Sequence, residues 1–249
     1  MKNVLEVAVR KERISRKTLP PGVAKVLKGL HFPVDVLLLC VRWYVAYSLS
    51  LLRNLEEMMQ EHGLEVDHST VHRWVIKLVP LFEKAFRKHK RPVRKSWRMD
   101  ETYIKVRGQW KYLYWAVDKA GDTVDFLLRA RRDKAAAQRY FEKAIDQNGA
   151  PETVTVDKSG ANLAALVAVN AERETPIRIR QCKYLNNIVE QDHRAIKSIV
   201  KPMMGFKDFR CARIILSGIE IMHVIRKGQM TAARRTTSSV AEKFYSLVM

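Results

Sequence analysis

Two hydrophobic patterns divide the chain into an N-terminal and a C-terminal part. From Phe32 to about Lys90, apolar residues recur at helical spacing. One such stripe consists of Val71, Trp74, Val75 and Leu78. From Trp97 onward the pattern changes to runs rich in β-branched and aromatic residues, which favour strands. The sequence therefore predicts an all-α segment followed by a segment that starts as a sheet.

The C-terminal part has a recognisable order of elements. Three predicted strands, 97–106, 109–118 and 123–132, are separated by the short turns RGQ and KAGD, which are typical of hairpins. The later predicted elements are a helix at 133–145, a strand at 151–157, a helix at 159–173, a strand at 175–184, and helices at 186–200 and 209–227. This order, βββαβαβα with one further helix, predicts an α/β mixed sheet with helices on both faces and matches an RNase H-like fold.

The N-terminal part contains a helix pair typical of DNA-reading modules. A predicted helix ends at Gly63, and a basic helix follows with Asp67 or Ser69 as its N-cap. A helix, a short turn and a capped basic helix indicate a helix-turn-helix, although any antiparallel helix pair can give this pattern. The candidate DNA contacts on the second helix are Ser69, Thr70, His72, Arg73 and Lys77.

These patterns give four predicted segments. Residues 1–30 are expected to be a basic N-terminal arm, and 31–90 a helix-turn-helix domain. Residues 91–228 are expected to form the RNase H-like catalytic domain with its C-terminal helix, and 229–249 a polar, flexible tail.

The charge balance indicates a polyanionic partner. The chain has 46 Lys and Arg against 26 Asp and Glu, a formal net charge of +20. Such an excess suits nucleic acid or an anionic membrane. The most apolar stretch, residues 34–52, carries Asp35 and Arg42, so a buried helix is a better interpretation than a membrane span. Without a secretory signal, and with cysteines that form no C-x-x-C pair, we expect a cytoplasmic protein whose partner is double-stranded DNA.

Three acids stand out against this predicted fold. Asp100 lies in the middle of the first strand, Asp157 ends the fourth, and Glu190 lies in the first turns of the helix after the fifth strand. The first and fourth strands can be neighbours in a mixed sheet, and the helix can pack over the same edge. Converging carboxylates repel one another unless cations lie between them, and hard oxygen ligands suit Mg²⁺. We therefore expect a site for two Mg²⁺ ions, with Mn²⁺ as an alternative.

Two further residues, each placed relative to one of these acids, complete this hypothesis. Lys197 follows Glu190 by seven positions and returns to nearly the same helix face, where it can hold a DNA phosphate. Glu101 is adjacent to Asp100, and alternation along a strand predicts that it points to the opposite face. There a basic partner or solvent is expected to satisfy it.

The chain resembles the DDE transposases of bacterial insertion sequences, and more closely the insertion-sequence-six family. The resemblance covers roughly His31 to Gln229. It rests on VDHSTVHRWV, WRMDETYIKVRGQWKYLYWAVD, VDK, KYLNNIVEQDHRAIK and MMGFKDFRCARIILSGIEIMHVIRKGQ. It implies that Asp100, Asp157 and Glu190 are the metal-binding catalytic triad, that Lys197 is the basic residue following the Glu, and that the helix-turn-helix recognises terminal inverted repeats.

The resulting hypothesis is a Mg-dependent DDE polynucleotidyl transferase. It would bind the ends of an insertion sequence, cleave phosphodiesters with metal-activated water and join the freed 3′-OH to target DNA. Because two ends must be held together, a homodimer or larger synaptic complex is expected. Two alternatives stay open: an RNase H-like nuclease without strand transfer, and a helix-turn-helix regulator with an inactive catalytic fold.

Overall fold

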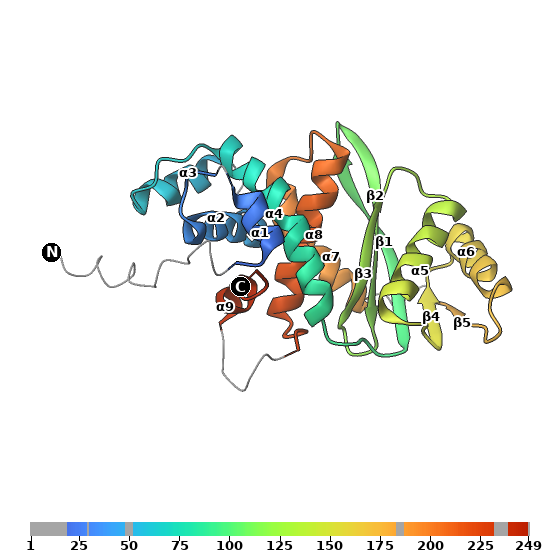
Figure 1. Cartoon of the computed structure of the whole chain (residues 1–249). Coiled ribbons are helices and arrows are strands. Elements are labelled where there is room, and N and C mark those ends of the chain that lie inside the picture. Colours follow the sequence, from blue (N-terminus) through green and yellow to red (C-terminus); the bar gives the residue numbers. More distant parts are fainter. Residues whose placement is uncertain (1–18, 29, 48–51, 183–186, 232–238, 249) are drawn as a thin grey trace.

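A five-stranded mixed sheet forms the centre of the C-terminal part (Figure 1). The computed structural model describes residues 19–28, 30–47, 52–182, 187–231 and 239–248. The strands are β1 (Ser96–Val106), β2 (Gln109–Asp118), β3 (Thr123–Arg129), β4 (Thr153–Val156) and β5 (Arg178–Gln181). Their spatial order is β3-β2-β1-β4-β5; β1 to β3 are antiparallel neighbours, whereas β4 is parallel to β1 and β5 is parallel to β4. This arrangement confirms the predicted RNase H-like sheet, including the pairing of its first and fourth strands.

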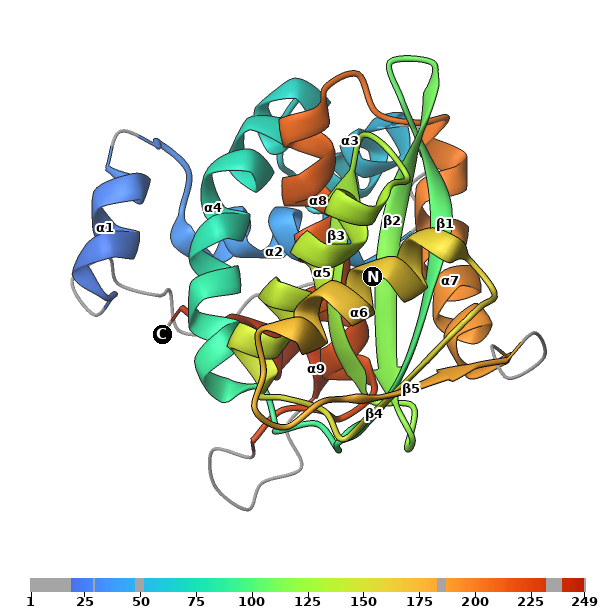
Figure 2. The same ribbon diagram turned by 90° about the vertical axis from the view of Figure 1, so that its right-hand side faces the viewer.

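Helices cover both faces of this sheet. Four helices precede the first strand along the chain: α1 (Pro21–Leu27), α2 (Val34–Ala46), α3 (Leu52–Glu61) and α4 (His68–His89). Between the later strands along the chain lie α5 (Lys134–Asn148) and α6 (Gly160–Ala171). After the last strand come α7 (Asn187–Val200), the short 3-10 helix η2 (Lys201–Met203), α8 (Phe209–Arg226) and α9 (Val240–Tyr245). In Figure 2, α5 and α6 lie in front of the sheet, with α4 and α8 on its other side.

Side-chain alternation along the strands separates two hydrophobic cores. Trp97 and Tyr114 pack in the core under α5 and α6. Ile104 and Trp115 pack in the larger core on the opposite face, together with residues of α4, α7 and α8. Because successive side chains of a strand point to opposite faces, the even-numbered positions of β1 face α7 and α8 and the odd-numbered ones face α5 and α6.

The N-terminal helices pack directly on the C-terminal part. Gly218 of α8 allows the close approach of α2, because a Cβ atom there would lie 2.6 Å from Val45 Cγ1. Arg87 of α4 forms ion pairs with Asp125 of β3 and Glu220 of α8, at 3.1 and 3.5 Å. The predicted boundary near residue 90 thus falls just after α4, and one hydrophobic core extends across it.

Local sequence signals account for several helix ends. The Asp67 carboxylate accepts hydrogen bonds from the amides of Ser69 and Thr70, so Asp67 is the N-cap of α4. Gly63 adopts a φ of +69° just after α3, as expected for a glycine that ends a helix. Asp133 caps α5 through the Ala136 amide, as its sequence position predicts.

Two terminal predictions need correction within the described residues. The end of the expected N-terminal arm forms α1, whose Val23 and Leu27 are buried against the core, whereas residues 1–18 lie outside the described part. The expected flexible tail contains α9, which begins with a Ser239 capping box. Its Phe244 is buried and stacks on Phe82 with ring centroids 4.4 Å apart. The apolar residues Phe244, Tyr245, Leu247 and Val248 form too short a run to show a helical period, so the sequence pattern did not reveal this packing.

The three cysteines are unpaired. Among the described residues, no helix is both long enough and apolar enough to cross a membrane.

Candidate active site

The site forms where β1 extends beyond the short strand β4. The two strands pair only from Ser96 to Arg98 of β1. From position 99 to its end at Val106 the edge of β1 therefore pairs with no other strand of the described residues, apart from a bridge to Phe206. Asp157 follows directly after β4, at the point where the pairing with β1 has ended. This geometry brings Asp157 beside the open edge at Asp100 and Glu101.

Three carboxylates gather at this edge. Asp100, Glu101 and Asp157 each offer an oxygen within 4.8 Å of the others. Burial raises the pKa of Asp100 to about 6, and the negative charges of Glu101, Asp157 and Glu190 act in the same direction. The cluster is therefore electrostatically unfavourable by itself. A divalent cation would relieve the repulsion, and the all-oxygen donor set suits a hard ion.

Glu101 is held by two neighbours from other elements. Arg132 Nε lies 2.5 Å from Glu101 Oε1, and Asn162 Nδ2 donates to Glu101 Oε2 at 2.9 Å. The Glu101 side chain is only 3% exposed. Alternation on β1 predicts that Glu101 faces away from Asp100 and meets a basic partner, and Arg132 is such a partner. Even so, Glu101 shares the carboxylate cluster, because at the open edge both faces of β1 can reach Asp157.

The same two neighbours also hold Asp157. Asn162 Nδ2 lies 3.1 Å from Asp157 Oδ1, which also accepts a hydrogen bond from the Ser159 amide at 3.1 Å. Arg132 Nη2 lies 3.4 Å from Asp157 Oδ2. Asn162 is fully buried, and its Oδ1 has no hydrogen-bond partner among the described residues. Asn162 thus bridges Glu101 and Asp157 and fixes their separation.

Glu190 lies in the first turn of α7. Its side chain is 51% exposed, and its Oε2 lies 3.9 Å from Arg194 on the next turn of the helix. It is not part of the 4.8 Å cluster, yet its charge contributes to the raised pKa of Asp100. The structure thus brings Asp100 and Asp157 together, whereas Glu190 lies outside their cluster and acts on Asp100 through its charge.

Helix α7 is fixed by a buried contact two residues after Glu190. Asp192 is 5% exposed, and its Oδ2 accepts hydrogen bonds from Trp115 Nε1 at 3.1 Å and from Lys227 Nζ at 2.5 Å. Its Oδ1 lies 3.1 Å from His223 Nε2. Burial acts to raise the pKa of Asp192, but its contacts with His223 and Lys227 outweigh burial and hold the pKa below its usual value. Asp192 is therefore an ionised anchor that links α7 to β2 and α8.

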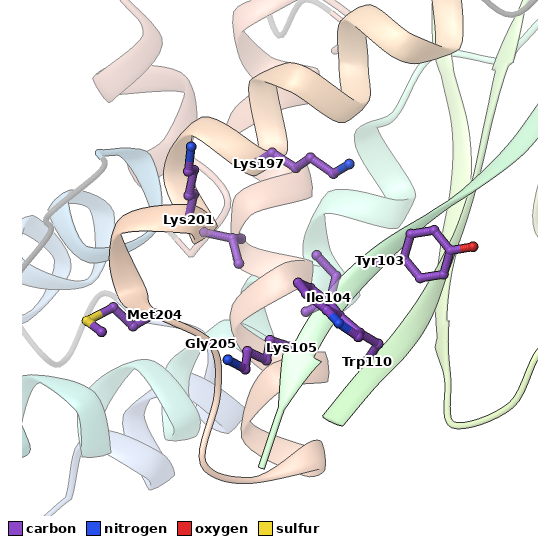
Figure 3. A pocket seen from close by; sticks show the side chains of 9 residues that line it. Tyr103, Ile104, Lys105, Trp110, Lys197, Lys201, Met204 and Gly205 are labelled. Atoms are coloured by element: carbon purple, nitrogen blue, oxygen red, sulfur yellow. The ribbon is translucent and has the colours of Figure 1, made fainter. Parts of the chain in front are cut away.

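Lys197 lies exposed on the same α7 face as Glu190. Its side chain lines a pocket beside the end of β1, close to Tyr103 (Figure 3). An exposed ammonium group on the helix face that carries Glu190 suits a phosphate contact.

The predicted DNA contacts on α4 differ in exposure. Ser69, Arg73 and Lys77 are exposed at four-residue intervals and so form one stripe on the helix surface. Arg73 Nη2 donates to Thr70 Oγ1 at 2.7 Å, which orients the guanidinium. His72 is half-buried and its Nδ1 lies 3.0 Å from Tyr44 Oη, so it is partly engaged with α2.

Sequence reasoning did not include Glu101, Arg132, Asn162 and Asp192 among the candidate site residues. Glu101 had a signal, since two adjacent acids in an apolar strand both need an explanation. The other three lie in ordinary loop or helix contexts. Their roles depend on contacts between residues distant in sequence.

The chain is similar to proteins of one family. A family model described as a DDE domain matches residues 94–229. A transposase for the insertion sequence-like element IS431mec of Staphylococcus aureus is 38% identical over 198 residues, which cover 79% of this chain and 87% of the relative. The transposase for insertion sequence element IS257 in transposon Tn4003, also from Staphylococcus aureus, is 37% identical over the same coverage.

Two solved structures show weaker similarity. The HTLV-2 integrase catalytic core domain in complex with magnesium matches in its dimeric form with a TM-score of 0.43, at 14% identity over 62% of this chain and 97% of that chain. Its trimeric form matches with a TM-score of 0.42, at 18% identity over 53% and 86%. The fold assignment given above rests on the strand order and connections of this chain.

Proposed function

Because the chain belongs to the insertion-sequence-six family of DDE transposases, we propose that Asp100, Asp157 and Glu190 are its catalytic triad. The chain is a DNA transposase and thus a polynucleotidyl transferase that binds a divalent metal. The observation that carries the residue assignment is the convergence of Asp100 and Asp157 at the open edge of β1, with the Glu190 charge close enough to affect Asp100. The three residues come from three elements distant in sequence.

We propose that two Mg²⁺ ions are the natural cofactor. The negative charges of Glu101, Asp157 and Glu190 all raise the pKa of Asp100, so a cation bound at Asp100 would interact favourably with each of these acids. When bound, the ions would activate the attacking oxygen and stabilise the leaving oxygen of a phosphodiester. The residues of the chain itself supply position and charge: Asn162 and Arg132 fix Asp157, and the Asp192 anchor fixes the helix that carries Glu190.

Lys197 is proposed as the phosphate contact of this site. It is exposed, shares a helix face with Glu190, and is seven positions away, about two helical turns or 10 Å along the axis. A lysine at this position can hold the DNA backbone while the scissile phosphate lies at the carboxylates. It would reduce the repulsion between DNA and the acidic cluster.

We propose that α3 and α4 form the element that recognises the terminal repeats. The exposed stripe of Ser69, Arg73 and Lys77, with Thr70 beside it, supports this assignment. His72 is a weaker candidate for a DNA contact, because it is half-buried and its Nδ1 lies within hydrogen-bond distance of the Tyr44 hydroxyl. The two ends of the element must be held together during the reaction, so the active form is proposed to be a homodimer or larger synaptic complex. Its place of action is proposed to be the cytoplasm, where its DNA substrate lies.

A strand-transfer assay tests the proposal. Purified protein is incubated with labelled duplexes carrying the terminal repeats that flank its gene, a target plasmid, and either Mg²⁺ or a chelator. We expect metal-dependent 3′ cleavage and joining of the 3′-OH to the plasmid. Pre-cut ends separate the steps: cleavage without joining would indicate a nuclease, and end binding without either reaction would indicate a regulator.

Matched variants assign the residues. Asp100→Asn, Asp157→Asn and Glu190→Gln should each abolish cleavage and joining while end binding persists. Glu174→Gln, an exposed acid after α6, is the matched control and should retain activity. Retained cleavage by one of the three variants would remove that residue from the triad.

A further inference from the structure

An open pocket lies beside the proposed active site, between the β1–β2 hairpin and the end of α7. It has a volume of about 650 Å³. Tyr103, Lys105 and Trp110 line it from the hairpin, and Lys197, Lys201 and Met204 line it from α7 and the segment that follows (Figure 3). We call this feature the hairpin pocket. Its size is suited to a ligand as large as a nucleotide.

The hairpin pocket has exposed aromatic walls. Trp110 is 62% exposed and Tyr103 47%, and their rings meet edge to face with centroids 6.4 Å apart. Alternation along the paired strands β1 and β2 assigns both rings to the sheet face that α5 and α6 cover further along. The hairpin projects beyond these helices (Figure 2). Exposed apolar side chains that lie next to one another, unlike single ones, often mark a binding site. No part of the chain that the structure describes covers them.

The charge of the hairpin pocket is uniformly positive. Three of its lining residues are lysines and none is acidic. Within the described ranges, none of the three lysines forms an ion pair. Aromatic faces combined with free ammonium groups are the usual means of binding single-stranded nucleic acid, through base stacking and phosphate contacts.

The backbone beneath the hairpin pocket is fixed. The Phe206 amide donates to the Lys105 carbonyl at 2.8 Å, and the Arg107 amide donates to the Phe206 carbonyl at 2.7 Å. Gly205 makes this possible, because it has a φ of +99° and a Cβ atom there would lie 2.9 Å from the Lys105 oxygen. The segment after η2 is thereby attached to the edge of β1, so the two walls hold a fixed spacing.

The hairpin pocket follows the carboxylate cluster along β1. Tyr103 is two positions after Glu101 on the same face of β1, a separation of about 7 Å along the strand. Lys197 belongs to both places, since it lines the hairpin pocket and shares a helix face with Glu190. A DNA strand that passes the carboxylates would reach the aromatic rings next.

We propose that the hairpin pocket binds an unpaired base of the DNA strand that passes through the active site, by stacking it on the Trp110 ring with the Tyr103 ring against its edge, while the lysines hold the adjacent phosphates. This inference rests on the proposed function and specifies how that site holds its substrate. A second copy of the chain is the competing occupant. A two-fold contact through this surface would place three lysines against three lysines, so self-association here is electrostatically disfavoured.

Tryptophan fluorescence provides a direct test, because Trp110 is the only exposed residue among the five tryptophans, all of which lie in the described ranges. Oligothymidine is titrated into the full-length protein, and a blunt duplex of mixed sequence serves for comparison. We expect oligothymidine to quench the red-shifted part of the emission, and the duplex to quench it much less. Trp110→Phe should abolish this quenching.

Affinity is measured separately by anisotropy of labelled oligothymidine. Trp110→Ala should weaken binding about 10-fold, and Trp110→Phe much less, because a phenyl ring still stacks. Lys201→Ala should lower the salt dependence of binding. Val167→Ala, which removes part of an exposed apolar side chain on α6, is the control and should bind as the wild type does. Thermal unfolding of each variant verifies that it is folded.

Two results would overturn the proposal. The first is equal affinity of Trp110→Ala and wild type for oligothymidine. The second is a change in the oligomeric state of Trp110→Ala, seen by sedimentation without DNA, with oligothymidine affinity unchanged, which would assign the pocket to a protein interface. These measurements require no strand joining. Failure of the joining assay would therefore reject the proposed function without deciding the fate of the pocket.

Discussion

Trp115 Nε1 donates a hydrogen bond to Asp192 Oδ2 at 3.1 Å, and this buried contact links the centre of the sheet to the helix that carries Glu190. His223 of α8 and Lys227, the residue after this helix, also contact the same carboxylate. The position of Glu190 relative to Asp100 therefore depends on a residue that itself faces away from the substrate. Asp192 is best described as a positioning residue.

Replacing this anchor should affect both stability and activity. Asp192→Asn would leave Lys227, which is 21% exposed, without its ionised partner. We expect a loss of about 2–4 kcal/mol in the free energy of unfolding, measured by denaturant titration. Asp146→Asn, an exposed acid of α5, is the control and should change little. A positioning role further predicts lowered turnover at saturating metal, whereas a purely structural role predicts normal turnover in the folded fraction.

The raised pKa of Asp100 predicts a pH-dependent effect of Asp100→Asn. A carboxyl whose pKa is about 6 in the folded protein, against an ordinary value of 3.8, favours folding at low pH and loses that contribution as the pH rises through 6. Without metal, Asp100→Asn should therefore raise the thermal midpoint by several degrees at about pH 8 and have little effect near pH 4. Differential scanning calorimetry with a chelator measures this. A lower midpoint at both pH values would contradict the burial argument.

Adding a divalent metal should make the wild type more stable than Asp100→Asn, the reverse of the order expected without metal at about pH 8. The wild type gains stability when a cation offsets the repulsion among its carboxylates, whereas Asp100→Asn lacks one of the proposed ligands. We expect Mg²⁺ or Mn²⁺ to raise the thermal midpoint of the wild type and to have a much smaller effect on the variant. Glu174→Gln serves as the control for general salt effects.

The Glu101–Arg132 pair should show strong coupling. Removing the guanidinium leaves a carboxylate whose side chain is 3% exposed with the Asn162 amide as its remaining described partner. Arg132→Gln should cost about 1–3 kcal/mol, and adding Glu101→Gln should recover part of that loss. A double-mutant cycle in denaturant titrations measures the coupling. Additive effects of the two substitutions would show that the pair is energetically independent.

The exposed stripe on α4 predicts two kinds of DNA contact. Arg73→Ala should weaken binding to the terminal repeat by about 1–3 kcal/mol if Arg73 reads a base edge, with little effect on unrelated DNA. Lys77→Ala should weaken binding to all sequences equally if Lys77 contacts phosphate. Gel-shift titrations on both DNA types distinguish these outcomes. An equal loss on both DNA types would make Arg73 a phosphate contact as well.

A large part of the fold follows from local sequence patterns. The strands β1 to β3, the cap of α5 at Asp133 and the helix end at Gly63 follow from alternation, spacing and turn chemistry. The cap of α4 is Asp67, one of the two candidates that the sequence offered. These signals involve neighbours along the chain, so they survive without knowledge of the tertiary structure. The neighbouring positions of the first and fourth strands followed from the order of elements.

The site depends more on tertiary structure. By itself the sequence determined that an acid lies within the first strand, that another ends the fourth, and that a third begins a helix. It did not determine that Glu101 joins Asp157, because alternation along an isolated strand sends Glu101 away from Asp100. Only the folded sheet shows that β4 is short and leaves the edge of β1 open, so that carboxylates from both faces meet there. The Asp192 anchor, the packing of Phe244 and the hairpin pocket likewise arise from contacts between distant segments, which local periodicity cannot encode.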